Sequence, residues 1–188
     1  MDYKELKDEE LAKKIKENDH IALGEIINRY QNKLLFYITK IIRDNDDAQD
    51  VVQQTFLKVY ENIQSFDEER KFSSWIYRIS HNLAINLIKK NKRLTSVEAH
   101  TLDWLDDHYR EVEDFIAKED REKLSQEMVG LLDYLRVEYK EIILLYYFEE
   151  KSYEEISDIL RIPESTVGVW LRRARSKLKI LVEKQHGK

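Results

Sequence analysis

The sequence predicts an all-α protein with two small helical domains joined by a linker, the C-terminal one containing a helix-turn-helix. Chain breakers are scarce, with 4 glycines and 1 proline among 188 residues, so little material is available for β-hairpins or tight turns. Apolar residues recur at helical spacing on both sides of a central stretch without any period. Hydrophobic residues make up 42% of the chain, which is enough apolar surface to bury real cores.

The first domain is expected over residues 1–95 and consists of several helices. Helical spacing of apolar residues runs from Ala12 to Ile42. The cluster Asp44–Asp47 breaks that pattern and supplies capping oxygens and negative charge for the next helix. That helix ends near Gln64, and a further helix is predicted from about Ser73 to Lys92.

The acidic linker is expected over residues 96–111, and the second domain over residues 112–188. The stretch without helical period from Leu94 to Arg110, about 17 residues at roughly 3.3 Å each, could reach about 55 Å. Helical spacing returns at Val112, continues to Leu135 and resumes from Ile142 to Tyr147.

The helix-turn-helix is predicted over the last forty or so residues. Ser152–Glu155 forms a capping-box pattern that opens a short helix. Arg161 and Ile162 make the turn, and Pro163 stands where a second helix would start. That second helix has an apolar stripe and basic residues on its other faces. The stripe consists of Val167, Leu171, Ala174, Leu178 and Leu181.

Charge is distributed unevenly, although the formal net charge is −5. No acidic residue occurs from Lys71 to Val97, and bases predominate from Arg161 to Lys188. These blocks indicate two modules that bind anions. Arginines of the second block can pair with guanine edges and phosphates of duplex DNA. Aromatic and Asn residues within the first block suit an opened DNA strand, but core packing of Trp75 and Tyr77 explains that block equally well.

The order of these motifs resembles the extracytoplasmic-function (ECF) group of the sigma-70 family of bacterial RNA polymerase sigma factors, from about Asp19 to Leu181. Four segments carry the resemblance. They are Asp47–Phe56, similar to the helix that binds core polymerase; Phe72–Asn86, similar to the segment that reads and melts the −10 element; Tyr139–Leu145 with Ser152–Ile156, which begin the second domain; and Ile162–Val167 with Leu171–Arg175, similar to the −35 recognition unit.

This resemblance implies a sigma factor that directs core polymerase to specific promoters and aids promoter opening. The implied partners are core RNA polymerase, double-stranded promoter DNA and the melted −10 strand. Family members are often held by an anti-sigma factor, and the sequence identifies none. The implied polymerase-binding residues are Asp47, Asp50, Gln53, Gln54 and Phe56. The implied −10 residues are Trp75, Arg78, Asn82, Asn86, Lys89 and Lys90. The implied −35 residues are Ser165, Thr166, Trp170, Arg172, Arg173 and Arg175.

The sequence departs from the family pattern at four places. Val137-Glu138 stand where a Pro commonly precedes the Tyr139 helix. Gln54 replaces the usual Glu. Arg161 stands near a position that is often Gly, and a left-handed conformation there would cost about 1 kcal/mol. Gly168-Val169-Trp170 replaces a stretch that is usually basic and polar, which puts the −35 sequence preference in doubt.

Other functions explain less of the sequence. The five histidines are dispersed, without an H-E-x-x-H pair, a nucleophile elbow or a glycine-rich phosphate loop. We therefore expect no enzyme activity, cofactor, metal or small-molecule substrate. The absence of cysteine, the charged start and the short apolar runs favour a cytoplasmic protein without membrane insertion. A stand-alone helix-turn-helix regulator is the alternative, but it leaves Asp47–Phe56 unexplained, whereas a protein-interaction module leaves Arg172–Arg175 unexplained.

Overall fold

The computed structural model describes residues 2–42, 44–94 and 129–186, and within these ranges every regular element is helical. The expected linker, 96–111, and the expected start of the second domain at residue 112 lie outside the described residues. The elements of the first unit are a 3-10 turn at Tyr3–Glu5, α1 (Asp8–Lys16), α2 (His20–Ile41), α3 (Asn45–Asn62), a 3-10 turn at Ile63–Ser65, and α4 (Phe72–Leu94). Those of the second unit are a 3-10 turn at Leu132–Tyr134, α6 (Val137–Ile143), a π-helical turn at Leu144–Phe148, α7 (Tyr153–Leu160) and α8 (Glu164–His186). The predicted all-α class is confirmed.

Aspartate caps separate the helices of the first unit. The Asp44 side chain accepts hydrogen bonds from the backbone N–H groups of Asp46 and Asp47, as the acidic cluster predicted. Asp19 caps α2 in the same way. The continuous periodicity from Ala12 hid the break before α2, where Asn18 takes a left-handed conformation with φ of 65°. Asn tolerates that region because its short polar side chain can bond locally.

Aromatic side chains fill the core of the first unit. Tyr30 packs edge-on against Phe72 and Tyr77, and Phe66 lies against Phe72 and Trp75. Trp75 is only 9% exposed, so in the free protein it belongs to the core, one of the two interpretations that the sequence left open.

The second unit packs α8 against α6 and α7. The predicted stripe of α8 is buried from Val167 to Leu178, and the Ser152–Glu155 capping box is confirmed. Two features differ from the expected long helices. The chain turns at Leu132–Tyr134, and the second core helix widens into the π-helical turn. Leu132 in the first place and Leu144 and Leu145 in the second stay buried, whereas Tyr134 is 68% exposed.

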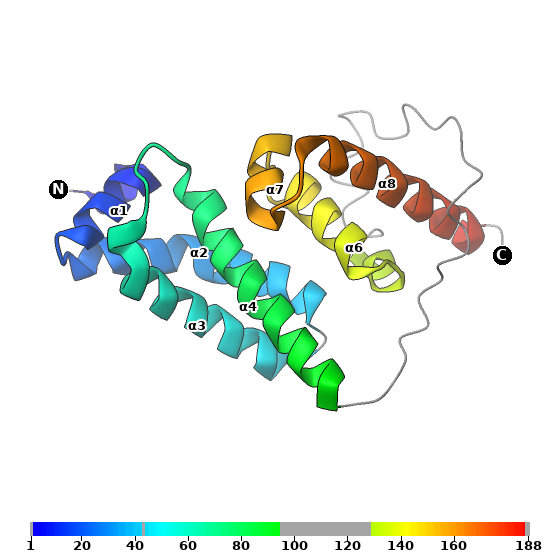
Figure 1. The fold of residues 1–188 in the computed structure, drawn as a ribbon, viewed down its shortest axis with the longest axis horizontal. Coiled ribbons are helices and arrows are strands. Elements are labelled where there is room, and N and C mark those ends of the chain that lie inside the picture. Colours follow the sequence, from blue (N-terminus) through cyan, green and yellow to red (C-terminus); the bar gives the residue numbers. More distant parts are fainter. Residues whose placement is uncertain (1, 43, 95–128, 187–188) are drawn as a thin grey trace.

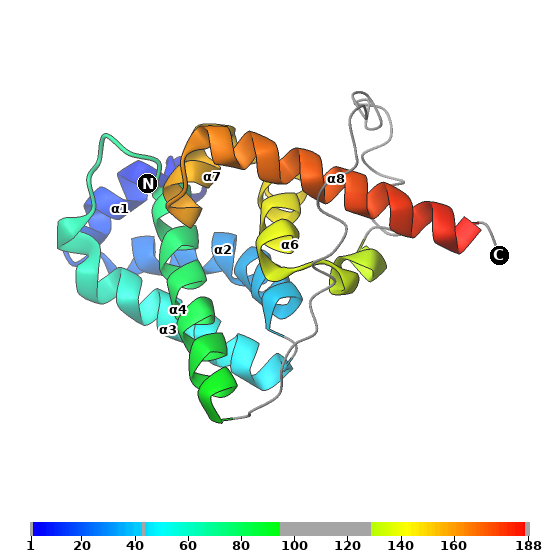
Figure 2. The ribbon, with the colours of Figure 1, turned by 45° about the vertical axis from the view of Figure 1, so that its right-hand side comes forward.

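The two units pack against each other (Figures 1 and 2). Helix α7 lies against α4, and α6 lies against the C-terminal part of α2. The contact between the units therefore joins the helix expected to read the −10 element to the first helix of the helix-turn-helix. No residue pattern in the sequence predicted this packing.

Candidate nucleic-acid interface

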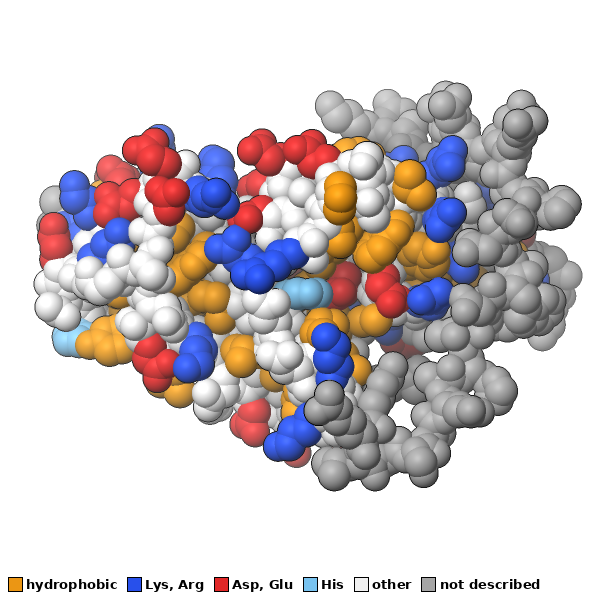
Figure 3. Space-filling model, viewed as in Figure 1, with side chains coloured by type: hydrophobic (Ala, Val, Ile, Leu, Met, Phe, Trp, Pro, Cys, Tyr) orange, Lys and Arg blue, Asp and Glu red, His pale blue; other side chains and the backbone are white. Residues whose placement is uncertain are grey.

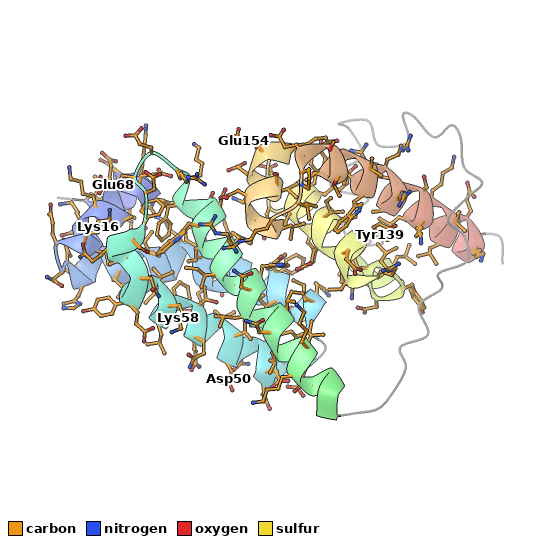
Figure 4. All side chains as sticks on the ribbon, viewed as in Figure 1. Lys16, Asp50, Lys58, Glu68, Tyr139 and Glu154 are labelled. Carbon is orange, nitrogen blue, oxygen red and sulfur yellow. The ribbon has the colours of Figure 1, made fainter. Side chains whose placement is uncertain are left out.

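The outer face of α3 is polar at its start and apolar further along. Asp50, Gln53 and Gln54 are exposed, whereas Asp47 and Phe56 are half-buried. Figure 4 shows Asp50 at the lower edge of the molecule. Leu57, one turn beyond Gln53, is 53% exposed, and Tyr60 follows on the same face. Helical spacing from Ala48 places Tyr60 on the apolar stripe of α3, and Leu57 fits no pattern in the sequence, so neither residue was predicted at the surface.

The exposed side of α4 presents four of the expected −10 residues. Asn82, Asn86, Lys89 and Lys90 are all exposed. Their spacing of 4, 3 and 1 residues places them on one helical face. Two amides and two ammonium groups in a row can donate to base edges and phosphates.

Arg78, the fifth expected −10 residue, is engaged by the other unit. Its Nη1 donates to Oδ1 of Asp158 on α7 at 2.7 Å. Arg70, in the loop before α4, lies 3.5 Å from the same oxygen. Figure 3 shows basic side chains gathered over the part of α4 next to α7. These arginines and Lys71 line a small hollow with Trp75.

About one turn further along α4, a buried carboxylate joins the two units. Glu141 on α6 is 3% exposed, and its Oε1 accepts from the Tyr37 hydroxyl at 3.1 Å. Nδ1 of His81 lies 2.7 Å from the same oxygen. In the tautomer that carries a proton on Nδ1, His81 donates to this oxygen. The pKa of Tyr37 is raised, by burial first and then by the charge of Glu141.

A third set of contacts surrounds Tyr77. Nζ of Lys151 lies 5.2 Å from the centre of the Tyr77 ring. Burial raises the pKa of the Glu149 carboxyl and lowers that of the Lys151 ammonium. The Phe36 and Phe148 rings, one from each unit, are 5.5 Å apart. The contact between the two units, which we call the seam, thus combines ionic, aromatic and hydrogen-bonded contacts.

The outer face of α8 carries the exposed part of the expected −35 set. Ser165, Arg172 and Arg173 are exposed, and Thr166 is half-buried. Trp170 packs partly against the core. A helix with arginines on one face and an apolar stripe on the other can enter a major groove.

Arg175 points into the protein. Its Nε donates to the Tyr147 hydroxyl at 2.5 Å, and its guanidinium lies 5.5 Å from the ring centres of Tyr146 and Tyr147. Lys177 similarly lies over Tyr139. In this conformation both cations cover tyrosines of α6 and the π-helical turn.

The described residues hold no group of three or more His, Cys, Asp or Glu that could bind a metal ion. Among these same residues, no helix is long and apolar enough to cross a bilayer.

Comparisons with known proteins identify both units. Residues 26–94 match the family described as Sigma-70 region 2, and residues 125–178 match Sigma-70, region 4. The ECF RNA polymerase sigma factor SigW of Bacillus subtilis is 32% identical over 176 residues, 89% of this chain and 92% of the relative. The ECF sigma-E factor of Haemophilus influenzae is 32% identical over 181 residues, 91% and 93% of the two chains. The structure of CnrH in complex with the cytosolic domain of CnrY shares the fold, with a TM-score of 0.68 at 21% identity over 94% and 97% of the chains.

Two helical units, one with a polar face on α4 and one with a helix-turn-helix, define a two-domain promoter-binding transcription factor. The chain belongs to the ECF group of RNA polymerase sigma factors. It directs core polymerase to specific promoters and aids their opening. Sigma factors are generally non-catalytic initiation factors. The alternative of a stand-alone regulator is not favoured, because it does not account for the region 2 match.

Proposed function

We propose that the two units divide promoter recognition between them. Residues 1–95 bind core polymerase and the −10 element, residues 112–188 bind the −35 element, and residues 96–111 link the two. In support of this division, α3 and α4 of the first unit and α8 of the second unit each present exposed polar or basic residues.

Core polymerase binds, on this proposal, to the outer face of α3. The exposed residues Asp50, Gln53 and Gln54 form its polar part, with Asp47 and Phe56 at its margin. Leu57 extends it as an apolar anchor, since a large exposed apolar side chain beside polar groups is typical of an interface core. This single continuous face carries the proposal for polymerase binding.

Promoter DNA binds to two further faces. Asn82 and Asn86 read bases of the melted −10 strand, while Lys89 and Lys90 contact its phosphates. Arg78 and Trp75 join them only after a rearrangement, because Arg78 is paired and Trp75 is buried in the free protein. Helix α8 contacts the −35 duplex through Ser165, Thr166, Trp170, Arg172 and Arg173. Arg175 supports that helix from behind by its bond to Tyr147.

The remaining features follow the family. The printed titles of two solved relatives describe complexes, CnrH with CnrY and the Bartonella quintana factor RpoE with the anti-sigma factor NepR. We propose that an anti-sigma factor also binds this chain. The protein acts in the cytoplasm, where polymerase is found, and has no catalytic activity, cofactor or small-molecule substrate of its own.

Run-off transcription tests the proposal. Core polymerase with the purified protein should give discrete transcripts from templates selected out of a randomised duplex library, and core polymerase alone should give none. Asp50→Asn should reduce both transcription and co-purification with polymerase. Glu154→Gln removes the same charge from an exposed site on α7, far from Asp50 in Figure 4, and should reduce neither. Equal activity of Asp50→Asn and wild-type protein would contradict the assignment of α3.

A further inference from the structure

The contact between α4 and α7 raises the question of what Arg78 does when no DNA is present. We infer that Arg70 and Arg78 form a phosphate-binding site for the promoter strand, and that the Asp158 carboxylate of the same chain occupies this site in the free protein. The inference rests on the proposed function, because the phosphate belongs to the −10 strand.

The geometry is that of an oxyanion between two arginines. Oδ1 of Asp158 lies 2.7 Å from Nη1 of Arg78 and 3.5 Å from Nη1 of Arg70. Guanidinium groups bind carboxylate and phosphate oxygens with the same fork geometry. A phosphate oxygen could therefore take the position of Oδ1 with both arginines in place.

The surroundings favour a nucleic acid as the displaced ligand. Lys71 and Trp75 line the same hollow, so a third cation and an aromatic ring adjoin the two arginines. Asp67 is the acidic residue of the first unit in this lining; its Oδ2 lies 3.6 Å from Nε of Arg70, whereas Asp158 lies near Nη1 of that guanidinium. Arginine and lysine side chains gathered at one hollow are the groups that bind nucleic-acid phosphates, whereas the buried Trp75 ring could stack on a base only after a rearrangement.

The site continues along α4 toward the other −10 residues. Arg78 precedes Asn82 by four residues, one helical turn, and Asn86 follows after four more. A strand running along α4 would therefore pass from Arg70 and Arg78 to the exposed amides. We call the structure with α7 packed against α4 the closed form. In this form α7 covers the first part of the path and leaves the second part exposed.

Closure does not depend on Asp158 alone. Glu141 joins α6 to Tyr37 and His81, and Lys151 covers the Tyr77 ring. These contacts hold α7 over α4, so that Asp158 is presented to the arginines at high effective concentration. A ligand that prefers the open form shifts the population toward it.

The two DNA-binding faces should respond differently to opening. Arg172 and Arg173 on α8 are exposed in the closed form, whereas Arg78 is paired. Loss of the Asp158 contact should therefore strengthen binding of a single strand by the free protein and leave binding of duplex −35 DNA unchanged.

Fluorescence anisotropy with the full-length protein tests this at low salt. The probe is a labelled single-stranded oligonucleotide of random sequence, about 12 nucleotides long, which spans a typical single-strand site. Asp158→Asn should bind it about tenfold more tightly than wild type. Glu154→Gln is the matched control, because it removes one charge from the same helix at an exposed position, and it should change affinity less than twofold.

A second variant separates the phosphate site from a general effect of opening. Adding Arg70→Gln to Asp158→Asn should remove most of the gain, whereas Lys13→Gln, an exposed cation on α1, should not. Equal affinities of Asp158→Asn and Glu154→Gln would overturn the occlusion, and retention of the gain by the Arg70→Gln double variant would overturn the phosphate site. Run-off transcription by wild-type protein distinguishes these failures from a failure of the proposed function, since it does not depend on Asp158.

Discussion

Tyr37 and Glu141 should be coupled in their effects on the free energy of unfolding, and a double-mutant cycle can measure that coupling. Tyr37 is fully buried, Glu141 is 3% exposed, and their oxygens are 3.1 Å apart. Tyr37→Phe removes the donor but keeps the ring, so packing is retained. The carboxylate keeps its contact with His81, and the loss of one hydrogen bond to a charged group should cost about 1.5–3 kcal/mol.

Glu141→Gln keeps the shape of the acceptor and removes its charge. It should also destabilise the protein, by about 1–3 kcal/mol, because a buried network loses its charge-assisted bonds. In the double variant, the Phe ring has no hydroxyl that needs a partner. The destabilisations of the two single variants should therefore sum to more than the destabilisation of the double variant. We expect a coupling energy of about 1 kcal/mol, within the range seen for residues in contact.

Urea denaturation followed by tryptophan fluorescence and circular dichroism provides the four free energies of unfolding. Tyr60→Phe, an exposed tyrosine of α3, is the control and should change the free energy of unfolding by less than about 0.5 kcal/mol. Additivity of Tyr37→Phe and Glu141→Gln within about 0.3–0.5 kcal/mol would refute the coupling and with it the role of Glu141 in the seam.

Three further predictions follow from single sites. Arg161→Gly should raise the free energy of unfolding by about 1 kcal/mol, because Arg161 adopts φ of 55° at the end of α7; a lower midpoint in urea would contradict this. Burial raises the pKa of Glu149 above its ordinary 4.5, so its contribution to stability is fully present below pH 4.5 and is lost as the pH rises through the raised pKa. Glu149→Gln should therefore show a smaller fall in thermal stability from pH 4.5 upward than wild type, and parallel curves would disprove the burial effect. Arg173→Ala should weaken binding of a selected −35 duplex by about 1–3 kcal/mol if its side chain reaches a base, and unchanged affinity of the folded variant would end that assignment.

Local sequence patterns predicted most of the helical elements. Asp44 and Ser152 occur as helix caps because their side-chain oxygens satisfy N–H groups that a helix leaves unpaired. The sequence predicted an energetic cost at Arg161 if its backbone is left-handed, and the observed φ of 55° is left-handed. The break at Asn18 was missed because the apolar period continues across it.

The candidate site could be predicted only in part. Asn82 and Asn86 are exposed on α4, where contact with a DNA strand requires them to be. Charge and aromaticity do not reveal whether a side chain faces solvent or a neighbouring helix. Tryptophan and arginine are both typical of a DNA-binding surface. In the structure, however, Trp75 lies in the core and Arg175 is hydrogen-bonded to Tyr147.

The sequence by itself determined the helical class, the caps, the buried stripe of α8 and the family, because each of these depends on residues close together in the chain or on motif order. Only the tertiary structure decided that Asp158 would meet Arg78 and that Glu141 would meet Tyr37 and His81. These partners are 60 to 104 residues apart, and their pairing depends on how the two units pack against each other. A one-dimensional pattern records which face of each helix is apolar or charged, and it carries no information on which two faces come into contact.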